Sequence, residues 1–243
     1  MPDFGFQWEV LQRLLPGIPV LLQLVSLSLA AGFAIAILVA LMRMSPVPPL
    51  RWIASSYVFL FRGTPLLVQI FLIYYGLSQF PEIRSSALWP FLRQPYWCAI
   101  LALTLNTGAY GAEIIRGGIQ SVPWGQVEAA RVSGMSGLLL FRRIILPVAL
   151  RQALPAYSSE MILMVKATSL GSTITLLELT GIAHKIISET YRAIEVFVVA
   201  GAIYLLINFL LTRAMLALEY WLSPHRRDAP ESARPLKTAD LVH

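Results

Sequence analysis

The sequence predicts an all-α protein that crosses a membrane several times. Of its 243 residues, 57% are hydrophobic and only 13% are charged, and the mean hydropathy is +0.67. This composition is too apolar for an ordinary soluble domain. A spanning helix needs about 20 mostly apolar residues, so the chain has room for about five spans and none for a separate catalytic domain.

Five apolar stretches separated by polar connections are the candidate spans. We expect these helices at residues 18–42, 54–80, 96–115, 152–179 and 196–218. A basic, proline-broken connection follows the first stretch, and the remaining connections are residues 81–95, 116–151 and 180–195. The second stretch is interrupted by a polar insertion of Arg62, Gly63, Thr64 and Pro65, which should face protein or water rather than lipid.

The two ends of the chain differ from the apolar middle. Residues 1–17 lack the basic start and short apolar core of a cleaved signal peptide, so we expect them to remain as an outer N-terminal segment. Residues 18–222 form the predicted transmembrane domain. Residues 223–243 are rich in Pro, Arg and Asp and are expected to be a disordered tail.

The distribution of positive charge predicts the topology. The formal net charge is +6, and 13 of the 19 lysines and arginines fall in alternate connections and the tail, on one side of the membrane. Because cytoplasmic connections carry an excess of Lys and Arg, the N-terminus is predicted outside and the C-terminus inside. This placement explains the basic composition without a nucleic-acid partner.

Few residues have the grouping that catalysis or metal binding requires. One cysteine, Cys98, cannot form an intrachain disulfide, and three scattered histidines lack metal-ligand spacing. The chain also has no phosphate-binding G-x-x-x-x-G-K-[ST] loop, so any ATP chemistry must come from another chain. A polytopic membrane enzyme, such as a lipid hydrolase or acyltransferase, and an ion channel remain less favoured alternatives.

The connection at residues 120–151 is too long to be a simple turn. Ser121 and Pro123 can begin a helix, Gly134 can end it in a left-handed conformation, and a second helix can run from Ser136 to just before Pro147. The small Ala129 and Ala130 keep the first helix thin enough for a partner's groove, and Glu128 with Arg131 can fix its orientation. The alternative is an interfacial helix that lies on lipid.

This connection resembles the EAA loop of bacterial ABC importer permeases. The matching positions are Glu128, Ala129, Ala130, Gly134, Ile144, Leu146 and Pro147. The runs at residues 61–69 and 105–110, together with Glu113, are similar to the polar amino-acid subfamily. Residues 74–80 and 187–192 are most similar to the M-type subunits for opines (octopine and nopaline) and for histidine or arginine.

The resemblance implies a non-catalytic permease subunit in the bacterial inner membrane, with a periplasmic N-terminus, a cytoplasmic C-terminus and a cytoplasmic EAA coupling loop. It implies three kinds of protein partner besides lipid: a second permease subunit of the Q type, expected to form a heterodimer; two ATP-binding subunits; and a periplasmic substrate-binding protein. This chain would bind no cofactor, because ATP and Mg²⁺ belong to the ATPase partners. The expected cargo is a polar or basic amino acid or an opine, with a neutral polar amino acid such as glutamine as the alternative.

Charged and polar residues within the spans predict where the cargo binds. Glu113, Glu160 and Lys166 lie at membrane depth and should face the protein interior. Two helical stripes suggest a lined cavity, from which Glu160 could meet a cationic side chain while Asn106, Thr107, Tyr110 and Thr168 hold the amino-acid group. Structural alternatives remain. Glu160 could bond to a neighbouring helix, and Glu113 could form a salt bridge to an arginine of the inner loops. Arg62, beside Thr64, could cap carbonyls freed by Pro65, and Lys166 could snorkel outward or pair with the second permease subunit.

Overall fold

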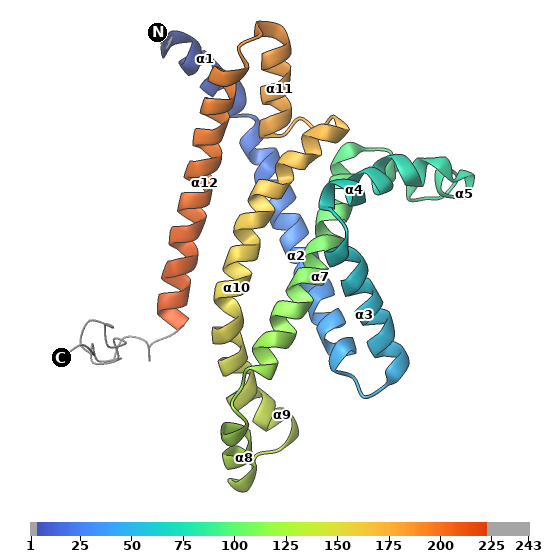
Figure 1. Cartoon of the computed structure of the whole chain (residues 1–243), viewed down its shortest axis with the longest axis vertical. Coiled ribbons are helices and arrows are strands. Elements are labelled where there is room, and N and C mark those ends of the chain that lie inside the picture. The colour runs from blue at the N-terminus through green and yellow to red at the C-terminus, as the bar shows by residue number, and fades with distance from the viewer. Residues whose placement is uncertain (1–3, 223–243) are drawn as a thin grey trace, which may run out of the picture.

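Residues 4–222, the part described by this computed structural model, form helices joined by short non-helical connections. Two short helices, α1 (Phe4–Leu14) and α11 (Leu179–Thr190), lie at one end of the long helices (Figure 1). At the opposite end lie α8 (Trp124–Val132) and α9 (Gly137–Leu140). The chain is therefore elongated along its spanning helices, with a separate group of short helices at each end.

The centre of the fold is the packing of α2 (Gly17–Met44) against α7 (Pro95–Gln120). Glycines let these helices approach closely: a Cβ at Gly108 would lie 2.7 Å from Ile35 Cγ2, and one at Gly111 would lie 2.9 Å from Ala36 Cβ. Small residues serve this purpose in membranes, where helix association depends on close van der Waals packing. Both helices lie where apolar stretches predicted them.

The second predicted span is sharply broken. Helix α3 (Pro48–Gly63) ends before Pro65, and the chain continues through α4 (Leu66–Phe71) and two irregular turns to Gln79 at an angle of 106°. The predicted interruption is thus confirmed. The predicted start was wrong, because Pro48 and Pro49 begin the helix rather than block it; the first helical positions need no N–H donor.

The connection between the broken span and α7 contains two single helical turns, α5 (Pro81–Arg84) and α6 (Trp89–Leu92). The last helix, α12 (Ala193–Leu222), contacts α1, α10 and α11 and leaves many large apolar side chains exposed, including Phe209 and Leu210. A helix with such an apolar exposed surface is suited to lipid. The predicted tail at 223–243 lies outside the described residues.

Helix α10 (Leu146–Ala167) differs from its prediction at both ends. The helix expected to stop before Pro147 instead continues from α9 through a π-helical turn, Phe141–Ile145, directly into α10. The wider turn accommodates the missing N–H and the ring of Pro147. At its other end the span expected to reach residue 179 ends at Ala167, and a 3-10 segment, Thr168–Ile174, follows.

Most of the polar connection predicted at residues 180–195 is helical. Helix α11 occupies Leu179–Thr190 and buries Leu179, Ala183 and Ile186 on one face. Within residues 4–222, counted by length and apolar character, three helices can span a membrane alone, and up to five spans result if each of two bent helix pairs counts as one.

Candidate functional site

A polar pocket of about 640 Å³ lies between the broken second span, α7 and the end of α10. Its volume is in the range of small-molecule sites. It collects most of the residues that the sequence predicted for cargo binding and for the pore. The predicted residues that line it are Arg62, Thr64, Pro65, Asn106, Thr107, Tyr110, Glu160 and Lys166. Thr168 and Glu113 are not part of this lining.

The break beside the pocket is stabilised by Gln69 and Asn106. The Gln69 side-chain amide donates to the carbonyl oxygens of Phe61 at 2.8 Å and Thr64 at 3.1 Å. Asn106 donates to Gln69 Oε1 at 3.0 Å and to Phe61 O at 3.3 Å. These bonds satisfy backbone carbonyls that the break at Pro65 leaves without helical donors.

The carbonyl groups at the break are capped by Gln69 and Asn106 and not by Arg62, so the capping role predicted for Arg62 is wrong. The Arg62 guanidinium lies over the ring of Tyr110, 5.1 Å from its centroid. It makes no hydrogen bond or ion pair within residues 4–222, although Glu160 and Glu113 lie close enough to interact with it electrostatically. No role was predicted for Gln69 from the sequence, although a glutamine four residues after a proline in an apolar run was the available signal.

Glu160 enters the pocket from α10 and is only 9% exposed. Within the described part of the chain its carboxylate has no hydrogen-bond or ion-pair partner. The structural bond to a neighbouring helix, which was the alternative for Glu160, is therefore not formed in this subunit. A buried carboxylate that faces a pocket unpaired is suited to a cationic ligand.

The other polar residues divide between pocket and core. Thr107 lines the pocket, but its hydroxyl also lies 4.0 Å from Met164 Sδ. Thr168 is 1% exposed and donates to Val165 O at 2.8 Å, away from the pocket lining. Lys166 lines the pocket and has no partner among residues 4–222, as expected for a residue that does not pair with Glu160 on the same helix.

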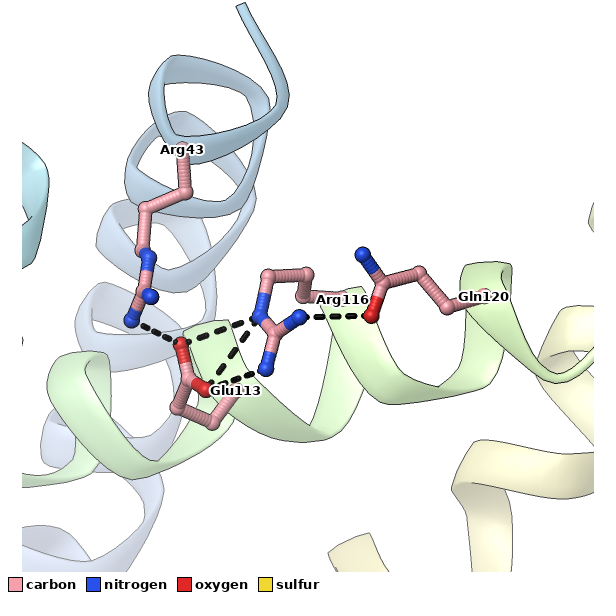
Figure 2. Close-up of polar contacts among 4 residues, drawn as sticks. All are labelled: Arg43, Glu113, Arg116 and Gln120. Atoms are coloured by element: carbon pink, nitrogen blue, oxygen red, sulfur yellow. Dashed lines mark hydrogen bonds and ion pairs between the residues drawn. The ribbon is translucent and has the colours of Figure 1, made fainter. Parts of the chain in front are cut away.

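Glu113 joins two helices near the start of the long connection (Figure 2). Its carboxylate accepts from Arg43 of α2 at 2.5 Å and from Arg116 of α7 at 2.8 Å. Arg116 also donates to Gln120 Oε1 at 2.5 Å. The predicted structural salt bridge is confirmed, and the network fixes the end of α7 from which the connection emerges.

Replacing Glu113 with glutamine should loosen this junction. The change removes the negative charge between two partly buried guanidinium groups, so we expect a loss of about 1–3 kcal/mol of stability. Thermal unfolding of the detergent-solubilised complex measures this loss. The exposed Glu82 offers a matched control, since its replacement by glutamine should leave the melting temperature unchanged; an unchanged melting temperature for both variants contradicts the stabilising role of Glu113.

The predicted turn at Gly134 is formed in the connection between α7 and α10. Gly134 has φ of +82°, the left-handed conformation that glycine adopts without strain. Met135 N donates to Ala130 O and Gly134 N donates to Arg131 O, both at 2.9 Å. This pair of bonds is a Schellman motif and satisfies the last carbonyls of α8.

The connection has a small core of its own and an exposed outer face. Val127, Ala130 and Leu140 are buried together, with Ile144 packed against them. Ala130 therefore belongs to the inner side, whereas its neighbours Glu128 and Ala129 are exposed on α8. Leu146 and Pro147 are half-buried at the start of α10. Large apolar side chains also stand exposed here: Trp124, Val132 and Leu138.

Glu178 is a buried acid that the sequence reasoning missed. It is 0% exposed and begins α11 by accepting from Thr180 N at 2.9 Å and Gly181 N at 3.0 Å. Tyr204 of α12 donates to the same carboxylate at 2.9 Å. Glutamate is not among the residues that usually cap a helix, so the sequence held no clear signal of this role. These bonds give it a structural role.

No group of three or more His, Cys, Asp and Glu side chains in residues 4–222 is placed to hold a metal ion. A pocket that gathers charged and polar side chains between apolar helices suits a membrane transport protein, because it offers a solute groups that lipid cannot supply. The chain belongs to the family of binding-protein-dependent transport system inner membrane components, whose sequence profile matches residues 32–223.

Curated relatives support this membership over nearly the whole chain. The octopine transport system permease protein OccM of Rhizobium meliloti is 59% identical over 97% of this chain and 95% of its own length. The nopaline transport system permease protein NocM of Agrobacterium fabrum is 55% identical, covering 90% of this chain and 91% of its own. The arginine ABC transporter permease protein ArtM of Escherichia coli K12 is 45% identical, covering 71% and 77%.

Solved structures show the same fold. A crystal structure of an amino acid ABC transporter with histidines has a TM-score of 0.80 and 37% identity, covering 90% of this chain and 98% of that one. The inward-facing MetNI methionine ABC transporter, at 19% identity and a TM-score of 0.70 over 91% and 99%, shows the fold alone. The chain is thus a non-catalytic inner-membrane permease subunit, and ATP hydrolysis belongs to partner subunits in this family.

Proposed function

We propose that this subunit forms part of the translocation pathway of an ATP-driven importer for a polar or basic amino acid or an amino-acid-derived opine. The observation that carries the proposal is Glu160, a buried and unpaired carboxylate in a polar pocket at membrane depth. The relatives named for octopine, nopaline and arginine transport support a cargo with a guanidinium group.

Binding in the pocket follows from the chemistry of its lining. The guanidinium or ammonium group of the cargo pairs with Glu160, since charge-assisted hydrogen bonds are the strongest available there. Asn106, Thr107 and Tyr110 offer hydrogen bonds to the amino-acid end. Thr168 donates to the backbone in this structure, so its part in binding requires a rotation of its hydroxyl.

The proposed topology has five spans, a periplasmic N-terminus and a cytoplasmic C-terminus. The excess of Lys and Arg in alternate connections supports this orientation. In agreement with it, α1 and the connection that carries α8 lie at opposite ends of the long helices (Figure 1). Substrate then arrives on a periplasmic binding protein at the α1 end, and the α8 end faces the cytoplasm.

The connection at 120–151 is proposed as the EAA coupling loop on which an ATP-binding subunit docks. Its exposed acid Glu128, exposed Ala129 and large apolar side chains suit the insertion of a helix into a partner's groove. ATP and Mg²⁺ bind to the two ATPase subunits. A second, Q-type permease completes the pathway as a heterodimer.

Alternating access follows from one continuous piece of helix. When the ATPase subunits close, they displace α8 and α9, and the π-helical turn passes this movement directly to α10. Helix α10 carries Glu160 and Lys166 in the pocket. Movement at the loop therefore reaches the residues that hold the cargo without an intervening flexible segment.

Replacing Glu160 with glutamine tests the proposal. The side chain keeps its size but loses its charge, so we expect uptake of a guanidinium cargo to fall by at least about tenfold while the complex still assembles. Uptake into proteoliposomes with the complete transporter measures the first quantity, and co-elution of the subunits measures the second.

The neighbouring Ser159 supplies a control on the same helix. It is exposed, does not line the pocket and donates to Pro155 O, so its replacement by alanine should leave uptake unchanged. Normal uptake by the Glu160 variant, or failure of that variant to assemble, contradicts a role of Glu160 in cargo binding.

A further inference from the structure

Arg62 lies where two cavities meet. It lines the polar pocket of about 640 Å³ together with Glu160, and it also lines a second cavity of about 400 Å³. Its neighbour Gly63 belongs to both linings as well. The other residues of the second cavity are Arg43, Ser55, Val58 and Phe59. One charged side chain is therefore shared by the proposed cargo site and the space next to it.

The second cavity lies on the side of the pocket that faces the long connection. Its Arg43 is in the last turn of α2 and pairs with Glu113, near the end of α7 from which the connection emerges (Figure 2). Along α7, Asn106 of the pocket, Tyr110 and Glu113 follow one another on one face over about 10 Å. The Arg62 guanidinium lies over the ring of the middle residue, Tyr110.

The Arg62 guanidinium has an acid on each side of it. Glu160 in the pocket and Glu113 at the junction both lie close enough to interact with it electrostatically. Glu113 is already paired with Arg43 and Arg116. Glu160 forms no ion pair in the described part of the chain, so the charge of Arg62 bears mainly on Glu160. The Arg62 side chain is exposed and has room to move toward either acid.

A cationic cargo brings a second positive charge to Glu160. This step rests on the proposed function, in which the guanidinium or ammonium group of the cargo pairs with that carboxylate. Two cations beside one buried carboxylate repel each other, because the protein interior screens charge weakly. We propose that Arg62 is a built-in competitor for Glu160, and that a cationic cargo displaces its guanidinium toward Glu113 and the second cavity.

This competition sets the affinity of the pocket without a bond between Arg62 and the cargo. It holds the affinity for cations below the value that Glu160 alone would give, and a transporter must release its cargo as well as bind it. When the cargo's cation leaves Glu160, the guanidinium of Arg62 returns and opposes rebinding. A neutral solute of the same shape does not compete with Arg62, so the effect is confined to cations.

A binding measurement tests the sign of this effect. The complex of this subunit with its partner permease and ATPases is placed in nanodiscs without the binding protein, and the dissociation constants of arginine, citrulline and agmatine are measured. Citrulline has the shape of arginine but a neutral urea group, and agmatine keeps the guanidinium group but lacks the carboxylate. Arg62→Gln should bind arginine and agmatine about tenfold more tightly than the unmodified complex does, and citrulline equally well.

Two variants serve as controls for this measurement. Arg62→Lys keeps the positive charge and should leave all three affinities close to those of the unmodified complex. Arg51 is exposed on the same helix and lines neither cavity, so Arg51→Gln should change no affinity.

Thiol labelling of Ser55→Cys measures the displacement itself. Ser55 lines the second cavity, and the chain's native cysteine, Cys98, is 0% exposed and does not compete for the reagent. If the cargo drives the Arg62 guanidinium into this cavity, saturating arginine should accelerate labelling by an anionic thiosulfonate and slow labelling by a cationic one of similar size. When Arg62→Gln is added to Ser55→Cys, arginine should change neither rate.

The possible results separate this inference from the proposed function. If Arg62→Gln weakens arginine binding or leaves it unchanged, or if arginine changes both labelling rates in the same direction, Arg62 is not a competitor and the proposed function stands. Arg62→Met replaces the glutamine variant if that variant does not assemble, and failure of both to assemble also overturns the inference, because the arginine then serves the structure. If the unmodified complex binds arginine no better than citrulline, and Glu160→Gln changes neither affinity, the proposed cargo site itself is wrong.

Discussion

A complex that carries lysine in place of Glu128 should insert into the membrane normally but should neither retain its ATPase subunits nor transport. Glu128 is exposed on α8 and has no ion-pair partner in the described part of the chain, so its charge is available to a docked protein. Reversing a charge inside an interface replaces an attraction by a repulsion, and we expect ATPase affinity to fall by roughly 100-fold. Copurification and proteoliposome uptake measure the two effects.

Two further substitutions separate the causes. Gln126 is exposed on the same helix two residues earlier, on a different face, and Gln126→Lys adds a positive charge without disturbing Glu128; it should retain the ATPase. Gly134→Asp places a negative charge on the turn and should also abolish transport. Gly134→Asn has a similar shape and a similar tolerance of positive φ, so it should transport almost normally. Unchanged uptake in both Glu128→Lys and Gly134→Asp contradicts the coupling role.

Replacing Glu178 with alanine should cause the largest loss of stability. The change removes a helix cap and leaves the N–H groups of Thr180 and Gly181 and the hydroxyl of Tyr204 without this acceptor in a fully buried site. A lost cap costs about 1 kcal/mol and each unsatisfied buried group about 1–3 kcal/mol, so we expect a loss of about 3–5 kcal/mol.

Thermal unfolding of the detergent-solubilised complex checks this expectation. Glu178→Gln keeps one carbonyl acceptor and should lie between the unmodified protein and the alanine variant. Tyr204→Phe removes a single donor and should have the smallest effect of the three. A melting temperature of the alanine variant equal to that of the unmodified protein contradicts the role of Glu178 as the anchor of α11.

The sequence predicted the long helices well because their signal is strong. Residues 18–42 form a single apolar run that admits few alternatives, and α2 occupies almost the same range. The break at Pro65 could also be predicted, because a polar, proline-containing insertion interrupts a membrane helix and is tolerated only where it faces protein or water. The stripe of Asn106 and Tyr110 followed from the helical repeat, and both residues line the pocket.

The errors came from residues whose effect depends on their neighbours in space. Pro147 usually ends a helix, but the π-helical turn before it depends on how α9 packs against α8. Lys185 and Glu189 made α11 look like a connection, although Glu189 pairs with Arg13 of α1, far away in the sequence. Thr168 follows the α10 stripe, yet the helix ends at Ala167 and its hydroxyl turns to the backbone.

The unbroken path from α9 through Phe141–Ile145 into α10 has a thermodynamic consequence. A rigid connection transmits work in both directions, and linkage requires that two sites joined by it influence each other equally. If nucleotide-driven closure raises the affinity of the pocket, occupancy of the pocket must favour closure by the same factor, and if closure lowers the affinity, occupancy must oppose closure by that factor. The closing equilibrium would then report whether the pocket is filled, without a separate sensor.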